Sequence, residues 1–295
     1  MIFRGRDIGR EVVMHAMFLT CLLLAPPDAI PAGKSTIEAR FDDVTLKLHL
    51  YKPQRFRDGP MLMVFHGVLR NGAEYRDHAV KMGDRFEALI VAPEFDEKTF
   101  PKPRYQFGGI VRDGKAVPPQ ERTGEYVNRI AREIRTREGR KTMSYALIGH
   151  SGGGQFLGRL APFVQTEAER IVISNPSSYT RPTVAAEFPY GFGGLPPELQ
   201  TEATFKAYLA QPVTIYVGSL DIVRDEYFDD SEKADLQGRS RFERGKNAFH
   251  FAKQLAEEKG WPFHWKLVIA EGIEHDHEKM FNNEACAKAL GWDRK

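Results

Sequence analysis

Cysteine is almost absent from this chain. Only two occur among its 295 residues, Cys21 and Cys286. This excludes a scaffold of several disulfides, and it excludes a zinc site built on C-x-x-C pairs. Cys286 falls in a predicted helix and is interpreted as a small buried apolar residue. Apolar packing must therefore hold the fold together, and a hydrophobic content of 42% over this length is ample for one large core.

The chain also lacks an excess of charge of either sign. Its 42 Lys and Arg residues and 40 Asp and Glu residues give a formal net charge of +2. No basic block stands out, so no nucleic-acid partner is expected. Internal repeats and low-complexity tracts are absent as well. A single domain is the simplest organisation for such a chain.

The first 32 residues differ from the rest and resemble a secretory signal peptide. Arginines precede an apolar stretch over residues 12–25, two prolines end it, and Ala29 and Ala32 offer small residues for cleavage. The stretch is too short to span a bilayer comfortably, so no stable membrane span is expected in the mature chain. We predict export to the periplasm or the medium, with a mature N-terminus near Ile30 or Gly33 and one domain over residues 33–295.

Short apolar strands alternate with amphipathic helices along the remainder. A hairpin is predicted over residues 35–41 and 44–51, followed by strands at 61–65, 89–92, 145–148, 170–174, 213–217 and 265–270. Helices are predicted at 74–87, 125–138, 155–164, 240–259 and 284–290. Continuous apolar strands separated by helices are typical of a mostly parallel central sheet with helices on both faces. The fold class is therefore α/β.

Two long segments, 96–123 and 177–211, do not fit the alternation and are rich in proline and glycine. The second follows the carboxyl end of a strand, where α/β folds bind ligands. We interpret it as a cap or pocket wall, and the alternative is a loop that only covers the surface. Its aromatic residues are the candidates for lining a substrate pocket: Tyr179, Phe188, Tyr190 and Phe192.

The segment from Gly149 to Gly153 matches the pattern Gly-x-Ser-x-Gly. An apolar strand precedes it and a predicted helix follows it, which is the setting in which this pattern holds a serine on a sharp turn. Glycines two positions to either side of the serine leave room for the chain to pass. Ser151 is therefore the candidate nucleophile.

A serine hydroxyl needs a base within hydrogen-bond reach, and that base needs an orienting carboxylate. Asp221 comes just after the strand at 213–217 and is the preferred acid, with Asp225 as the alternative. His275 follows the last strand and is the preferred base, with His277 as the alternative. A metal site formed by His275, Asp276 and His277 is disfavoured because no further ligand cluster accompanies them.

Acyl transfer also needs hydrogen-bond donors for the developing oxyanion. One is the backbone N–H of Gly152, which follows the serine. The second is predicted to be the N–H of Val68, because His66 and Gly67 directly follow a buried strand and let the chain turn inward. His66 itself is interpreted as structural. No cofactor and no metal is expected.

These motifs, in this order along the chain, resemble the α/β-hydrolase superfamily, in which the acid follows the serine and the histidine comes last. Residues 66–71 and the turn at 272–276 are most similar to exported esterases of the polyhydroxybutyrate-depolymerase and feruloyl-esterase kind. Glu274 replaces the second glycine of that turn, which keeps His277 as an alternative base. The secreted depolymerases commonly use disulfides, which a mature chain with one cysteine cannot form.

The resemblance covers residues 44–290 and implies a catalytic domain of the α/β-hydrolase fold. It implies cleavage of a small-molecule or polymer ester through an acyl-serine intermediate. Two alternatives remain, an amide or peptide hydrolase with the same triad and a non-catalytic binding protein.

The arginine-rich segment 237–245 is a candidate anion site, although we favour a solvated helix start with ion pairs to Glu232 or Glu243.

Overall fold

A computed structural model describes residues 29–42 and 44–293. Eight strands form one twisted sheet in the order β1-β2-β4-β3-β7-β8-β9-β10. The two pairings β1-β2 and β2-β4 are antiparallel, and every pairing from β4 to β10 is parallel. The strands are β1 (Gly33–Phe41), β2 (Val44–Lys52), β3 (Met61–Phe65), β4 (Leu89–Glu94), β7 (Tyr145–His150), β8 (Arg170–Ser174), β9 (Val213–Gly218) and β10 (Lys266–Ala270).

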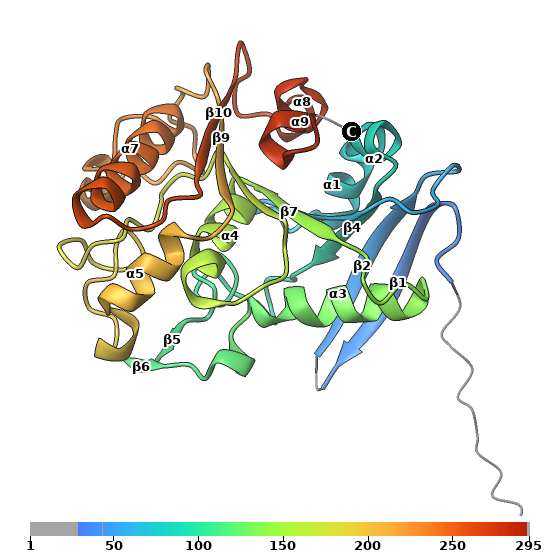
Figure 1. Ribbon diagram of the computed structural model, residues 1–295, viewed down its shortest axis with the longest axis horizontal. Coiled ribbons are helices and arrows are strands. Elements are labelled where there is room, and N and C mark those ends of the chain that lie inside the picture. The colour runs from blue at the N-terminus through green and yellow to red at the C-terminus, as the bar shows by residue number, and fades with distance from the viewer. Residues whose placement is uncertain (1–28, 43, 294–295) are drawn as a thin grey trace, which may run out of the picture.

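Helices cover both faces of this sheet (Figure 1). One face packs against α1 (Gly72–His78), α2 (Val80–Phe86), α8 (His277–Asn282) and α9 (Ala285–Leu290). The other face packs against α3 (Glu125–Arg137), α4 (Gly152–Phe163), α5 (Glu202–Leu209) and α7 (Arg241–Lys259). The central strands β3 and β7 are buried along their whole length, which explains their unbroken apolar sequences. The α/β prediction is confirmed.

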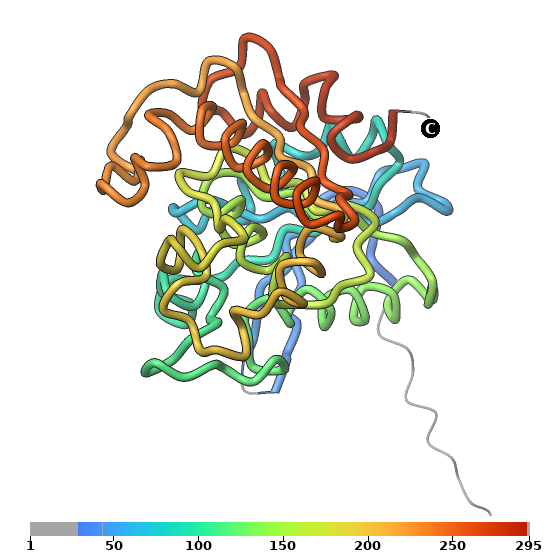
Figure 2. The backbone as a smooth tube through the Cα atoms, turned by 60° about the vertical axis from the view of Figure 1, so that its left-hand side comes forward, coloured from blue at the N-terminus to red at the C-terminus, as the bar shows by residue number. Residues whose placement is uncertain are grey.

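The two long segments contain regular structure that the sequence analysis did not predict. The first holds a small hairpin of β5 (Val111–Arg112) and β6 (Lys115–Ala116). The second contains α5, whose N-cap Thr201 accepts a hydrogen bond from the N–H of Thr204 over 3.1 Å. A cap of this kind followed by apolar residues at helical spacing was a signal available in the sequence. Figure 2 shows both segments at the lower left of the view, and Phe107 of the first contacts Phe188 of the second.

Ile30, the second residue that the structure describes, packs against the folded body of the protein. Its side chain is 3% exposed, its N–H donates to Glu138 Oε1 over 3.1 Å, and its carbonyl accepts from Lys52 Nζ over 3.1 Å. A leader that ended at residue 32 would remove this buried residue, whereas cleavage after Ala29 would retain it. The predicted leader is otherwise outside the described residues. Within 29–42 and 44–293, no helix has the length and apolar character needed to cross a bilayer.

Candidate active site

Ser151 sits on a strained turn between β7 and α4. Its φ of 56° and ψ of −117° lie in a region that residues with a side chain rarely adopt. The turn is crowded, because a Cβ on Gly149 would collide with the carbonyl of Gly153, and one on Gly153 would collide with the carbonyl of Phe65. Glycine is therefore required at both positions, and the serine side chain is held beyond the carboxyl edge of the sheet.

The loop after β3 approaches this turn closely. A Cβ on Gly152 would lie 3.1 Å from the backbone nitrogen of Val68, so the two predicted oxyanion donors are neighbours. His66 anchors the loop from inside. Its Nε2 accepts the N–H of Phe95 over 2.9 Å, and its Nδ1 donates to the carbonyl of Gly67 over 2.9 Å. Burial lowers the pKa of His66 to about 3, so the ring is neutral and has a structural position.

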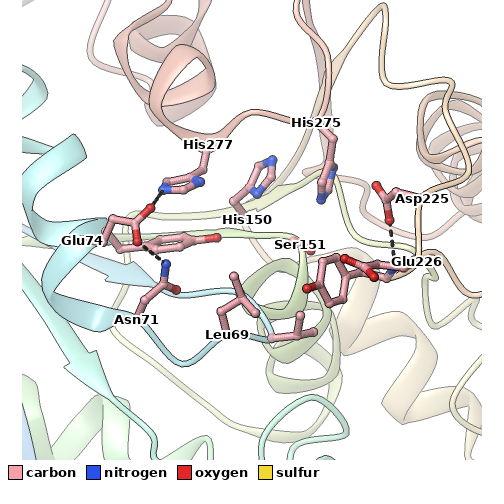
Figure 3. Close-up of a pocket in the computed structure, with 13 residues that line it drawn as sticks. Leu69, Asn71, Glu74, His150, Ser151, Asp225, Glu226, His275 and His277 are labelled. Atoms are coloured by element: carbon pink, nitrogen blue, oxygen red, sulfur yellow. Dashed lines mark hydrogen bonds and ion pairs between the residues drawn. The ribbon is translucent and has the colours of Figure 1, made fainter.

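Asp221 and His275 meet at the same edge. The Nδ1 atom of His275 lies 2.7 Å from Oδ2 of Asp221, and the aspartate is only 1% exposed. In Figure 3 the other side of the His275 ring is directed toward Ser151. Residues far apart in the sequence therefore meet here, since Asp221 and His275 are separated by 54 positions and His275 lines the same cavity as Ser151.

Asn175 is a site residue that the sequence analysis missed. It directly follows β8, has a φ of 48°, and its Nδ2 donates to Asp221 Oδ2 over 2.5 Å. Its Oδ1 accepts the N–H of Gly218 over 3.3 Å. The signal was its place at a strand end, the same signal that led to Asp221. Asn175 therefore orients the carboxylate that binds His275.

Asp225, the alternative acid, has a different partner. Both of its oxygens accept hydrogen bonds of 2.8 Å from the guanidinium of Arg241, which is fully buried. Partial burial raises the pKa of the Asp225 carboxyl, but the hydrogen bonds and charge of Arg241 lower it more, so its net pKa is below the usual range. Arg241 also lies 3.5 Å from Asp221 Oδ1 and so faces both carboxylates.

The expectation of a solvated, arginine-rich helix start holds for Arg239, whose side chain is 78% exposed, but is wrong for the two arginines that follow it. Arg241 and Arg244 are 0% exposed, and they pair with Asp225 and Asp235 rather than with the predicted glutamates. Arg244 also packs over the ring of Phe228, 4.1 Å from its centroid. Both guanidiniums are therefore interior cross-links between the chain after β9 and α7, and an anionic substrate cannot reach them.

His277, the alternative base, lies across His150 from His275 (Figure 3). Its ring stacks on Tyr75 with centroids 4.0 Å apart, and its Nε2 lies 2.8 Å from Nδ1 of His78. Burial and the nearby His78 lower the pKa of His277 to about 4. Glu74 Oε1 is 3.8 Å from the same Nε2 atom, so His277 belongs to a separate cluster with His78 and Glu74.

His150 separates the two groups of histidines. It is 2% exposed, and its ring centroid lies 4.5 Å from that of His275 and 5.8 Å from that of His277. Burial, and then the neighbouring His275 and His277, lower its pKa well below the usual value. Neither ring nitrogen has a hydrogen-bond partner among the residues that the structure describes. A neutral imidazole therefore forms part of the wall beside His275.

These residues enclose a cavity of about 330 Å³ beside Ser151 (Figure 3). Among the described residues that line it, none is Lys or Arg, and three are carboxylates. The lining comprises Gly67, Val68, Leu69, Asn71, Glu74, Tyr75, His150, Ser151, Asp225, Glu226, Tyr227, His275 and His277. Leu69 and Tyr227 are well exposed at 65% and 48%, which gives the mouth of the cavity an apolar character.

The four aromatic residues expected to line the pocket do not do so. Tyr179 and Phe192 are 3% and 0% exposed and belong to the core, and Phe188 packs on Phe163 and Phe107. Tyr190 donates from its hydroxyl to Asp229 over 2.8 Å. The prediction was wrong because the segment folds against α4 and α5, which buries Tyr179 and Phe192 and leaves Phe188 and Tyr190 half-buried away from the cavity.

No protein-family model matches the chain, and no curated protein sequence matches it either. Several solved structures do match the chain. The poly(3-hydroxybutyrate) depolymerase LpqC from Bordetella parapertussis is 33% identical with a TM-score of 0.81, over 88% of this chain and 90% of LpqC. Poly(aspartic acid) hydrolase-1 from Sphingomonas sp. KT-1 is 28% identical with a TM-score of 0.80, over 90% of this chain and all of the other.

A third similar structure is the serine hydrolase FphF from Staphylococcus aureus. It is 12% identical with a TM-score of 0.52, over 89% of this chain and 98% of FphF, and this likeness concerns the fold alone. The first two similarities extend over nearly the whole length of both chains. Together they support a hydrolase activity for this protein.

Proposed function

The chain belongs to the α/β-hydrolase superfamily, and we propose that within it the protein is a carboxylic ester hydrolase that acts through an acyl-serine intermediate. One observation carries the proposal. A buried carboxylate is hydrogen-bonded to Nδ1 of His275, and the far side of that imidazole borders the cavity that holds Ser151. This is the arrangement that converts an unreactive hydroxyl into a nucleophile.

The reaction follows from these positions. Ser151 Oγ attacks the ester carbonyl carbon while Nε2 of His275 takes the hydroxyl proton. The negative charge that develops on the carbonyl oxygen is met by the N–H groups of Val68 and Gly152. His275 then gives its proton to the leaving alcohol, and water repeats the sequence to release the acid. The carboxylate of Asp221 stabilises the imidazolium that forms.

The lining of the cavity favours a substrate without negative charge. Glu74 and Glu226 bring carboxylates to the wall, whereas the paired Asp225 is neutralised by Arg241. Leu69 and Tyr227 offer apolar contact at the mouth. We therefore propose a neutral ester with an apolar portion. A polyanion such as the poly(aspartic acid) for which one similar hydrolase is named would be repelled.

Amide hydrolysis is the second candidate, because the same triad serves both bonds and poly(aspartic acid) hydrolase-1 is a similar chain. A matched pair of neutral p-nitrophenyl ester and p-nitroanilide substrates separates the two. We expect faster turnover of the ester in the intact protein. Replacing Ser151→Ala should lower that turnover by about 10⁴-fold to 10⁶-fold, because the attacking atom is gone.

The exposed His250 on α7 supplies the control, and His250→Ala should turn over the ester at the rate of the intact chain. Undiminished turnover in Ser151→Ala would contradict the proposal. Faster cleavage of the anilide than of the ester would move the assignment to an amide hydrolase. Folded protein that binds the ester and never turns it over would indicate a binding protein.

Two conservative substitutions test which aspartate orients the base. Asp221→Asn should lower kcat by about 10⁴-fold, because an amide in that place favours the wrong tautomer of His275. Asp225→Asn should lower kcat by less than about tenfold, since its carboxylate contacts Arg241 instead. Far-UV circular dichroism establishes that both variants are folded. A larger loss of kcat in Asp225→Asn would transfer the role to Asp225.

We also propose export, with cleavage between Ala29 and Ile30. The packing of Ile30 supports this position over the one after Ala32, because its side chain and both backbone groups have partners in the folded body. N-terminal sequencing of the protein released from expressing cells should begin at Ile30. A mature protein that begins at Gly33 would show that the contacts of Ile30 are dispensable, and an intact N-terminus in the cytoplasm would contradict export.

A further inference from the structure

A cluster of metal-ligating side chains lies beside the proposed catalytic residues and takes no part in the proposed reaction. It consists of Glu74 and His78 on α1 and His277 at the start of α8. One donor atom from each side chain can be chosen so that all three lie within 4.8 Å of one another. Glu74 and His78 are four residues apart on one helix, a spacing that puts two ligands on the same face.

We propose that Glu74, His78 and His277 form a binding site for a divalent ion of the zinc class, in the wall of the cavity next to Ser151. Two imidazoles and one carboxylate are a common ligand set for Zn²⁺, with water in the fourth position. Bonds of about 2.0–2.1 Å in a tetrahedral site place the ligand atoms about 3.3 Å apart.

The observed separations are close to this requirement. His78 Nδ1 and His277 Nε2 are 2.8 Å apart, and His277 Nε2 and Glu74 Oε1 are 3.8 Å apart. Each distance differs from a tetrahedral edge by about 0.5 Å. Small side-chain rotations suffice to open the histidine pair and bring in the carboxylate. All three side chains are accessible enough to admit an ion, with exposures of 50%, 28% and 19% for Glu74, His78 and His277.

Outer contacts already orient these side chains as ligands. The Nε2 atom of His78 lies 3.6 Å from Glu278 Oε2, which favours the tautomer that leaves Nδ1 free to bind an ion. Asn71 Nδ2 donates to Glu74 Oε2 over 2.7 Å and leaves Oε1 toward His277. Stacking on Tyr75 at an interplanar angle of 5° holds the His277 ring. Metal ligands in proteins usually have such second partners.

The two helices are also tied together where the ligands meet. Asn282 Nδ2 donates to the carbonyl of His78 over 3.1 Å, which joins α8 to the end of α1. The cluster therefore does not depend on a mobile side chain reaching across a gap. Because Glu74 and His277 also line the cavity, a bound dication would reverse the sign of charge along that wall.

The inference is tested by metal binding, which is independent of catalysis. Full-length protein freed of metal with a chelator is titrated with Zn²⁺ by calorimetry, and with Co²⁺ by its visible absorption. We expect one bound ion per chain and the absorption of a tetrahedral Co²⁺ site. His78→Ala and Glu74→Gln should each weaken Zn²⁺ binding by about tenfold or more, since even the loss of an outer partner has effects of that size.

Two controls keep the outcomes distinct. His250→Ala removes an exposed histidine outside the cluster and should bind Zn²⁺ as the intact chain does. Ser151→Ala should also bind normally, so failure of the esterase assignment would leave this result untouched. Absence of Zn²⁺ binding to the intact chain would overturn the inference. His78→Ala and Glu74→Gln variants that bind Zn²⁺ as tightly as the intact chain would also overturn it. A hydrogen bond between two neutral imidazoles would then explain the 2.8 Å contact between His78 and His277.

Discussion

The carboxylate of Asp221 is the group on which the organisation of the site depends. A buried charge is costly unless it is paired and hydrogen-bonded. At 1% exposure, this one has three side-chain partners: His275 and Asn175 on one oxygen and Arg241 opposite the other. Each partner comes from a different part of the chain. Satisfying one charge thus brings together the ends of β8, β9 and β10 with the start of α7.

Arg241 gives this arrangement its electrostatic balance. It binds Asp225 with two short hydrogen bonds and stands further from Asp221, at 3.5 Å. A guanidinium hydrogen-bonded to both oxygens of Asp221 would compete with the imidazole of His275 for the same carboxylate. The second aspartate engages the arginine instead and leaves Oδ2 of Asp221 to His275 and Asn175. This division explains why two aspartates four residues apart have different surroundings.

Much of this architecture could be predicted from the sequence, because parallel strands deliver the residues after them to one edge. That rule predicted Ser151, Asp221 and His275 at one edge, where Ser151 and His275 line a common cavity and Asp221 contacts His275. It applies equally to Asn175, whose amide is not one of the residue types that the triad requires. Strand limits were close to those observed, since continuous apolar runs mark buried strands. The sequence predicts one helix over residues 74–87, whereas the structure has two, α1 and α2, divided at Ala79. No proline or glycine at that position marks the division.

Other features depend on tertiary packing that no local pattern reports. Charged residues are usually exposed, so nothing in the arginine-rich segment indicated that Arg241 and Arg244 would be interior. The aromatic residues of 177–211 fit a pocket wall or a core equally well, and only the fold of the segment decided for the core. The pairing of His78 with His277 joins positions 199 residues apart, a contact that a single sequence does not disclose.

The most direct test of the central claim is a crystal structure of the protein after reaction with a fluorophosphonate, whose adduct mimics the tetrahedral intermediate. We predict phosphorus bonded to Ser151 Oγ, and a phosphoryl oxygen about 3 Å from the backbone nitrogens of Val68 and Gly152. His275 should remain hydrogen-bonded to Asp221. Labelling of another residue, or a phosphoryl oxygen that points away from both nitrogens, would contradict the account.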